Sequence, residues 1–173
     1  MDVFEAIKFR RSIRSYQPKE IPKKSLERII DAFRFAPSAN NEQPWKLIIV
    51  KNEELKKDLA KACNQQWFIA EAPCILVACG LPNFSKIGGY SSSLMVDVGI
   101  AFTCMMLAAY EEGLGTCYIG AFSEYDVKKI LNIPDAVRVV GLTPLGYPQK
   151  QIKELGLRKS VKDVVYHEKY GEQ

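Results

Sequence analysis

The sequence from residue 91 to residue 112 reads SSSLMVDVGIAFTCMMLAAYEE and predicts one long helix. This helix is apolar on nearly every side, whereas a surface helix keeps a polar stripe. It must therefore be covered all round, in the core of its own chain or in an interface between subunits. Its longest uncharged run, residues 98–110, is shorter than the roughly 18 residues that indicate a membrane span. We therefore expect no membrane contact.

Working outward from this helix, the hydrophobic pattern alternates between helices and strands. Asp2, Asn52 and Ser123 stand where N-caps are expected, each just before a helical pattern. Helices are expected over residues 3–9, 23–35, 53–63, 65–71 and 124–131, and strands over residues 45–50, 74–79, 116–120 and 136–145. Residues 82–89 are expected to form a flexible loop. The pattern predicts an α+β fold with a central mixed sheet flanked by helices.

Length and composition narrow the class of protein. A chain of 173 residues with 47% hydrophobic residues is expected to form one globular domain. The net charge of +4 is spread along the chain, so we expect no nucleic-acid partner. His167 is the only histidine, which argues against a histidine-rich metal site and a histidine-based triad, and leaves a cysteine-only metal site as a minor alternative.

Cellular location is inferred from the cysteines and the first residues. The five cysteines include no C-x-x-C pair, which favours free buried thiols in a reducing compartment. Asp2 and Glu5 stand where a signal peptide would need apolar residues. We therefore expect a cytoplasmic protein.

Three segments carry side chains suited to binding. Arg10, Arg11, Ser12 and Arg14 place three guanidiniums and a hydroxyl within five residues, which suits a phosphate. A solvated basic loop is the alternative interpretation of this segment alone.

The second and third segments are a polar loop and a glycine-rich stretch. Residues 37–45 contain Ser38, Asn40, Asn41 and Gln43, which offer donors and acceptors to a planar polar heterocycle; an ordinary connecting loop is the alternative. Residues 113–122 read GLGTCYIGAF, where glycines allow close backbone approach. This stretch is not a G-x-G-x-x-G fingerprint, so it does not indicate a Rossmann fold.

Taken in order, these segments resemble the nitroreductase-like, FMN-dependent flavoproteins. The segment APSANNEQPW at residues 36–45 fits the family pattern A-P-S-x-x-N-x-Q-P-W. The RRSIR segment at residues 10–14, the long helix followed by GLGT at residues 113–116, and RKS at residues 158–160 complete the match. The resemblance covers nearly the whole chain, residues 1–173, as a single domain.

The resemblance implies an intertwined homodimer with two FMN molecules in its interface. It implies that Arg10, Ser12 and Arg11 hold the phosphate and ribityl chain, and that Arg14 reaches toward the ring. It implies that Ser38, Asn41 and Gln43 come from the partner subunit, that Ile119 and Gly120 lie over the ring near N5, and that Arg158 closes on the phosphate. Some members carry an acidic residue where this chain has Ile119.

The activity that the resemblance implies is a ping-pong transfer of hydride from NADH or NADPH, through FMN, to a small acceptor. Nitroaromatics and quinones are the usual acceptors. No protein side chain is then expected to act as a catalytic acid, base or nucleophile. Three alternatives are a flavin-binding protein without turnover, a dehalogenase and a flavin-degrading relative on the same fold.

The C-terminal extension, residues 149–173, changes character. It is polar at first and then carries a short apolar segment, residues 161–166. Two arrangements account for that segment. It lies on a partner subunit, or it adds a strand to the sheet of its own chain.

Overall fold

A four-stranded sheet forms the centre of the protein, in a computed structural model that describes residues 2–150, 152 and 156–172. The strands lie in the order β1-β2-β6-β5, and every pair is antiparallel. A single parallel bridge between Ser12 and Thr116 adds the arginine loop at the β5 edge and makes the sheet mixed. The strands are β1 (Trp45–Val50), β2 (Cys74–Gly80), β5 (Gly115–Thr116) and β6 (Arg138–Gly146).

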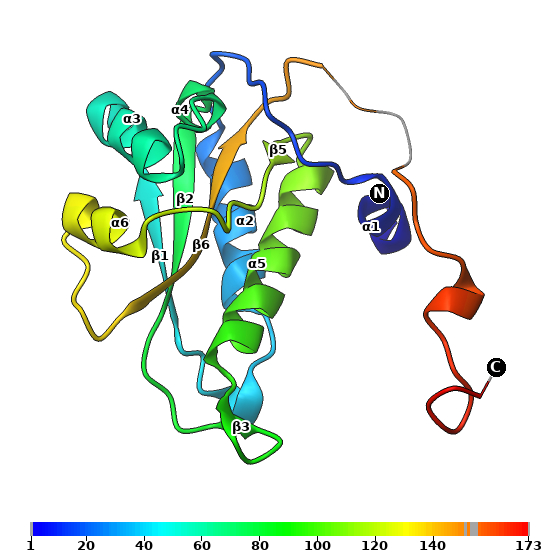
Figure 1. The fold of residues 1–173 in the computed structure, drawn as a ribbon. Helices are drawn as coiled ribbons and strands as arrows, with labels where there is room; N and C mark the ends of the chain where they lie inside the picture. The colour runs from blue at the N-terminus through cyan, green and yellow to red at the C-terminus, as the bar shows by residue number, and fades with distance from the viewer. Residues whose placement is uncertain (1, 151, 153–155, 173) are drawn as a thin grey trace.

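Helices cover both faces of this sheet, which confirms the predicted α+β fold (Figure 1). Helices α2 (Lys23–Arg34) and α5 (Leu94–Glu111) lie on one face. Helices α3 (Glu53–Ala62), α4 (Phe68–Glu71) and α6 (Glu124–Leu131) lie on the other. Helix α1 (Val3–Phe9) stands beside the C-terminal end of α5.

Side-chain caps fix where three helices begin, as the sequence predicts. The Asp2 carboxylate accepts a hydrogen bond from the Phe4 amide. The Asn52 side chain caps α3, and the Ser123 hydroxyl caps α6. Each cap satisfies a backbone N–H that has no partner within the helix.

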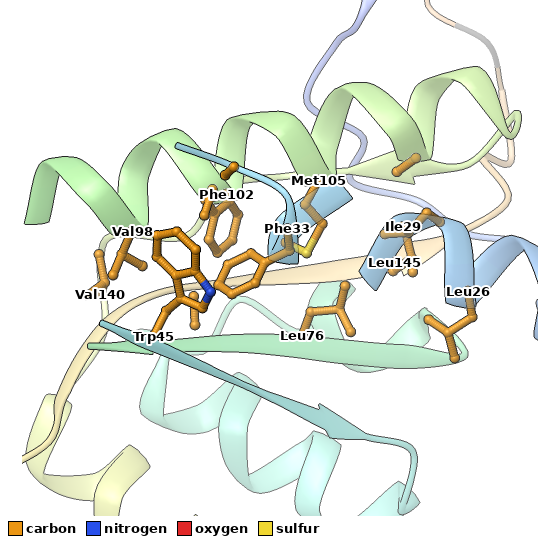
Figure 2. Packing of buried hydrophobic residues seen from close by; sticks show 14 of the residues in the cluster. Leu26, Ile29, Phe33, Trp45, Leu76, Val98, Phe102, Met105, Val140 and Leu145 are labelled. Carbon is orange, nitrogen blue, oxygen red and sulfur yellow. The ribbon is translucent and has the colours of Figure 1, made fainter. Parts of the chain in front are cut away.

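The core is two layers of apolar side chains, one on each face of β2. Every residue of β2 is buried, because helices cover both of its faces. On the α2–α5 side, Phe33 and Trp45 meet edge to face with ring centroids 5.8 Å apart, and Leu76 packs in the same layer (Figure 2). This layer fixes α5 against the sheet.

All five cysteines are free, as predicted, and four of them are buried. Burial raises the pKa of Cys63 to about 12 and the pKa of Cys74 and of Cys79 to about 11. Those three thiols stay protonated at neutral pH and behave as small apolar side chains.

The N-terminal boundary predicted for the long helix is wrong. Helix α5 begins at Leu94, and Ser91–Ser92 form strand β4, which pairs with β3 (Lys86–Ile87). The segment expected to be a loop therefore contains a hairpin. Gly88 and Gly89 make its turn with φ of 60° and 76°, values that glycine adopts without strain. The Asn83 amide donates to the Ser93 hydroxyl and fastens the hairpin to the start of α5.

The strand predicted at residues 116–120 is also shorter than expected. It ends at Thr116, because the next amide, of Cys117, donates to the hydroxyl of Thr143 instead of to a backbone carbonyl. Ile119 rejoins the sheet only as a single bridge to Leu142.

The chain itself covers helix α5 on one face only, so its own core accounts for part of the burial expected from its composition. Its inner face is fully buried, whereas Met95, Val96 and Ile100 on the outer face are exposed by 57%, 50% and 38%. Among the described residues, α5 alone has the length and hydropathy of a membrane-spanning helix, and 44% of it is buried inside the protein. Its packing against β2 and α2 is that of a core helix with one apolar face left open.

The C-terminal segment forms no strand in its own sheet, so that alternative is wrong. Residues 156–172 lie apart from the sheet, with a short 3-10 helix at Val161–Asp163 (Figure 1). Ser160 and Asp163 form a capping box that favours this turn over an extended strand. All the described residues from 156 onward are exposed.

We predict that Leu76→Ala destabilises the fold by about 2–5 kcal/mol, because it removes a fully buried side chain at the centre of the α2–α5 layer. Equilibrium unfolding in urea measures the change. Lys46→Ala, an exposed position on the neighbouring strand, is the control. A Leu76→Ala protein as stable as the control variant would contradict this account of the core.

Candidate functional site

The arginine loop, residues 10–14, is held against the β5 edge of the sheet. The Ile13 amide donates to the Thr116 carbonyl at 2.9 Å. A Cβ on Gly115 would lie 2.6 Å from Cγ1 of Ile13, closer than side chains tolerate. Glycine at position 115 therefore allows the loop to approach the strand this closely.

A cavity of about 450 Å³ opens between this loop and the C-terminal end of α5. Arg10, Arg11 and Ile13 line one side, and Tyr110 and Leu114 line the other. The turn that ends α5 is a Schellman motif, in which the Leu114 amide donates to the Ala109 carbonyl and Gly113 takes a φ of +73°. This turn aims the chain from α5 directly into β5.

The cavity lining carries more positive than negative charge, because it contains Arg10 and Arg11 but only one carboxylate, that of Glu111. Burial lowers the pKa of Arg10, and the guanidiniums of Arg11 and Arg158 lower it further. Among the residues that the structure describes, no carboxylate forms an ion pair with Arg10. Like charges gathered in a partly buried site repel one another, and an anion among them removes that repulsion. The site therefore suits a phosphate.

The residues expected around the phosphate do not all have the same surroundings. The Arg11 guanidinium donates to the Lys8 and Arg10 carbonyls at 2.8 and 2.7 Å, so part of its role is to cap α1. Ser12 is half-buried beside Thr116, and Arg14 is exposed further along the loop.

The polar loop, residues 38–43, lies at the opposite end of α5. The Ala39 amide donates to the carboxylate of Asp97 in the first turns of that helix, at 3.0 Å. An 18-residue helix is about 27 Å long. Asp97 beside the polar loop and Tyr110 beside the arginine loop are about 20 Å apart along the helix axis, so the two loops of one chain lie near opposite ends of α5.

Hydrogen bonds inside the polar loop select the groups that it presents. The Ser38 hydroxyl oxygen accepts from the Gln43 amide, and the Asn41 side-chain oxygen accepts from Gln43 Nε2, each at 3.0 Å. The Ser38 hydroxyl proton and the Asn41 amide protons are then the donors available to a ligand. Such donors match the carbonyl oxygens of a flavin ring.

The two residues expected over the ring lie in different environments. Ile119 is buried, and its amide donates to the Leu142 carbonyl at 2.8 Å. Gly120 is exposed, and the ring of Tyr118 lies 3.1 Å from where its Cβ would stand. The amide of Ile119 is thus committed to the sheet, which leaves Gly120 as the one of the two that can offer its backbone to a ligand.

The sequence interpretation passed over Asp97. Its carboxylate is 3% exposed and joins the polar loop to α5. The signal was present in the sequence, as an acidic residue in the first turns of an otherwise apolar helix.

The fold and the site together define a class of protein: an α+β protein with an arginine-lined cavity beside the edge of its sheet. The sequence model of the "Nitroreductase family" matches residues 7–87 and 68–147. The chain belongs to the nitroreductase family.

Individual proteins agree with this assignment. The structure of a nitroreductase family protein from Clostridium novyi NT is 36% identical, with a TM-score of 0.83 over 99% of this chain and 96% of that one. The FMN reductase [NAD(P)H] of Bacillus subtilis is 32% identical over 85% of this chain and 66% of its own length. The iodotyrosine deiodinase of Thermotoga neapolitana is 26% identical over 84% of this chain and 88% of its own length.

Proposed function

We propose that this protein is an FMN-dependent oxidoreductase that takes hydride from NADH or NADPH and passes it to a nitroaromatic, a quinone or a similar acceptor. The observation that carries the proposal is the partly buried Arg10, gathered with Arg11 and Arg158 and paired with no described carboxylate. Membership of the nitroreductase family and the similarity to an FMN reductase support it.

The residues present fit FMN. Arg10, Ser12 and Arg158 would hold its phosphate through charge-assisted hydrogen bonds, and Arg11 would add positive charge to the same cavity. Arg14 would reach from the same loop toward the ring, and the exposed Gly120 would offer its backbone amide to the ring. When bound, FMN supplies the hydride chemistry, and this chain supplies binding, orientation and charge. Donor and acceptor would occupy the same ring face in turn, which gives ping-pong kinetics.

The site needs a second copy of this chain. Ser38, Asn41 and Gln43 lie near the far end of α5 from Arg10, so a second chain would supply them to the FMN whose phosphate Arg10 holds. A partner whose α5 runs antiparallel would bring its polar loop to the ring edge. The exposed apolar face of α5 is the surface that such a partner would cover, and Val3, Phe4 and Ile7 on α1 extend it.

The C-terminal segment is proposed to embrace the partner. Val161, Val164 and Val165 are exposed by 73%, 63% and 40%, as expected of side chains that another subunit covers. Of this extension, residues 151, 153–155 and 173 lie outside the described residues. The Arg158 guanidinium is near enough to Arg10 to contribute to lowering the pKa of Arg10, which supports the proposal that Arg158 contributes to phosphate binding.

An absorbance spectrum of the purified protein, before and after anaerobic addition of NADH or NADPH, tests the function. We predict a flavin band that bleaches with one of the two donors. A band that resists both would favour a flavin-binding protein without turnover. Absence of a band, even after FMN is added, would refute the proposal. Product analysis with a nitroaromatic, a quinone and a halogenated phenol then separates reduction from dehalogenation.

We predict that Arg10→Ala weakens FMN binding about tenfold or more, because it removes a charge-assisted hydrogen bond to the phosphate. Fluorescence titration of the apoprotein measures the affinity. Lys129→Ala removes an exposed cation on α6 and should leave the affinity unchanged. Equal affinities in the two variants would exclude Arg10 from the phosphate site.

We predict that Ile100→Asp converts the protein from a dimer to a monomer, because it places a carboxylate in the apolar face of α5. Light scattering should then give the 19.5 kDa mass of one chain. Tyr125→Asp changes an exposed aromatic residue on α6, away from that face, and should remain dimeric. An Ile100→Asp dimer, or a monomeric wild-type protein, would disprove this interface.

A further inference from the structure

The polar loop has a backbone that needs support from outside. Asn40, Asn41 and Gln43 take φ values of 51°, 54° and 49°, in the left-handed region that side chains other than glycine rarely adopt. Three such residues within four positions make the conformation costly, and it persists only where surrounding contacts determine it. The loop is therefore held in shape by its neighbours.

The first support is a buried carboxylate. Asp97 accepts a hydrogen bond from the Ala39 amide at 3.0 Å and another from the Ser93 hydroxyl at 2.7 Å. It is 3% exposed and stands on α5, the most rigidly packed helix of the fold. Asp97 thus ties the backbone of the loop to a fixed element.

The second support comes from the hairpin formed by β3 and β4. Ser85, which is buried, donates its hydroxyl to Glu42 and accepts from Asn40 Nδ2 at 3.0 Å. The Phe84 amide donates to the same Glu42 carboxylate at 3.2 Å. Side chains of the loop are therefore bound to the hairpin, as its backbone is bound to α5.

These contacts leave the ligand-facing groups untouched. Asp97 and Ser85 contact Ala39, Asn40 and Glu42, whereas Ser38 and Asn41 keep their donors. A network that binds three residues of a strained loop fixes the direction of the remaining ones, which lowers the cost of ordering them when a ligand binds.

We infer that Asp97 and Ser85 are positioning residues, which hold the polar loop in the shape that receives the flavin ring of the partner subunit's site. The inference rests on the proposed function for the identity of the ligand. Asp97 acts on the loop backbone and Ser85 on its side chains, and neither touches the cofactor. The binding geometry of the loop is then present before FMN arrives.

The test compares Asp97→Ala and Asp97→Asn with the wild-type dimer. Amide hydrogen exchange of residues 38–43 in the apoprotein measures how stably the loop is folded. FMN titration measures the affinity of the site for the cofactor. In Asp97→Ala we expect exchange at Ala39 to be faster and the Kd for FMN to rise about tenfold or more, as for loss of a hydrogen bond to a charged group. Asp97→Asn keeps an acceptor oxygen and should restore most of both properties.

Lys86→Ala is the matched control, because Lys86 is an exposed residue of β3, next to Ser85 in the chain, and its side chain forms no hydrogen bond to the polar loop among the described residues. It should leave exchange at Ala39 and the Kd for FMN unchanged. Ser85→Ala provides a second variant should Asp97→Ala fail to fold, and it is expected to speed exchange across Asn40 and Glu42 and to weaken FMN binding.

Unchanged exchange in Asp97→Ala and Ser85→Ala would overturn the inference, and so would faster exchange with an unaltered Kd. An equal rise in Kd in Lys86→Ala would overturn it as well, because a general loosening of the hairpin would then explain the effect. If the wild-type protein binds no FMN, the proposed function fails, while the exchange rate of Ala39 still decides whether Asp97 anchors the loop.

Discussion

The packing of α5 against β2 and α2 is the constraint on which the rest of the protein depends. Fully buried Val98, Phe102 and Met105 fix the helix to the sheet along its inner face. Because the helix is a fixed element of the core, its length sets the distance between the cavity at one end and the polar loop at the other. One end closes the cationic cavity, and the other anchors the polar loop through Asp97. A flavin site built from both therefore requires two chains, and the same helix presents the apolar face on which they would meet.

Local signals in the sequence were sufficient to predict most of the helices and strands. Asp2, Asn52 and Ser123 marked helix starts because capping is a short-range interaction, and the fully apolar strand β2 could be recognised by composition. The hairpin at β3 and β4 was not predicted, since it depends on Asn83 reaching Ser92 and Ser93. The early end of β5 likewise depends on Thr143, which is distant in sequence. Such contacts between separated residues leave no periodic pattern.

In the candidate site, too, short-range features could be predicted from the sequence and long-range contacts could not. The arginine loop and the polar loop were recognisable from residue type and from their order along the chain. Their separation along α5 was not, because it follows from how the helix is placed. Ile119 was expected over the ring, and the structure commits its amide to Leu142. Asp97 was overlooked because the role of a buried carboxylate is clear only when its hydrogen-bond partner, here the Ala39 amide, is known.

Two features of the site are unfavourable for the free protein. Arg10 is partly buried beside other guanidiniums, and the polar loop holds three side-chain-bearing residues in the left-handed region. Glycine in the loop would relieve the backbone strain, and a carboxylate beside Arg10 would compensate its charge. Their presence is understood if a phosphate and a planar ring offset them, since a ligand that binds only the folded state stabilises it. In the proposed function, FMN binding would therefore restore the stability that these two features remove.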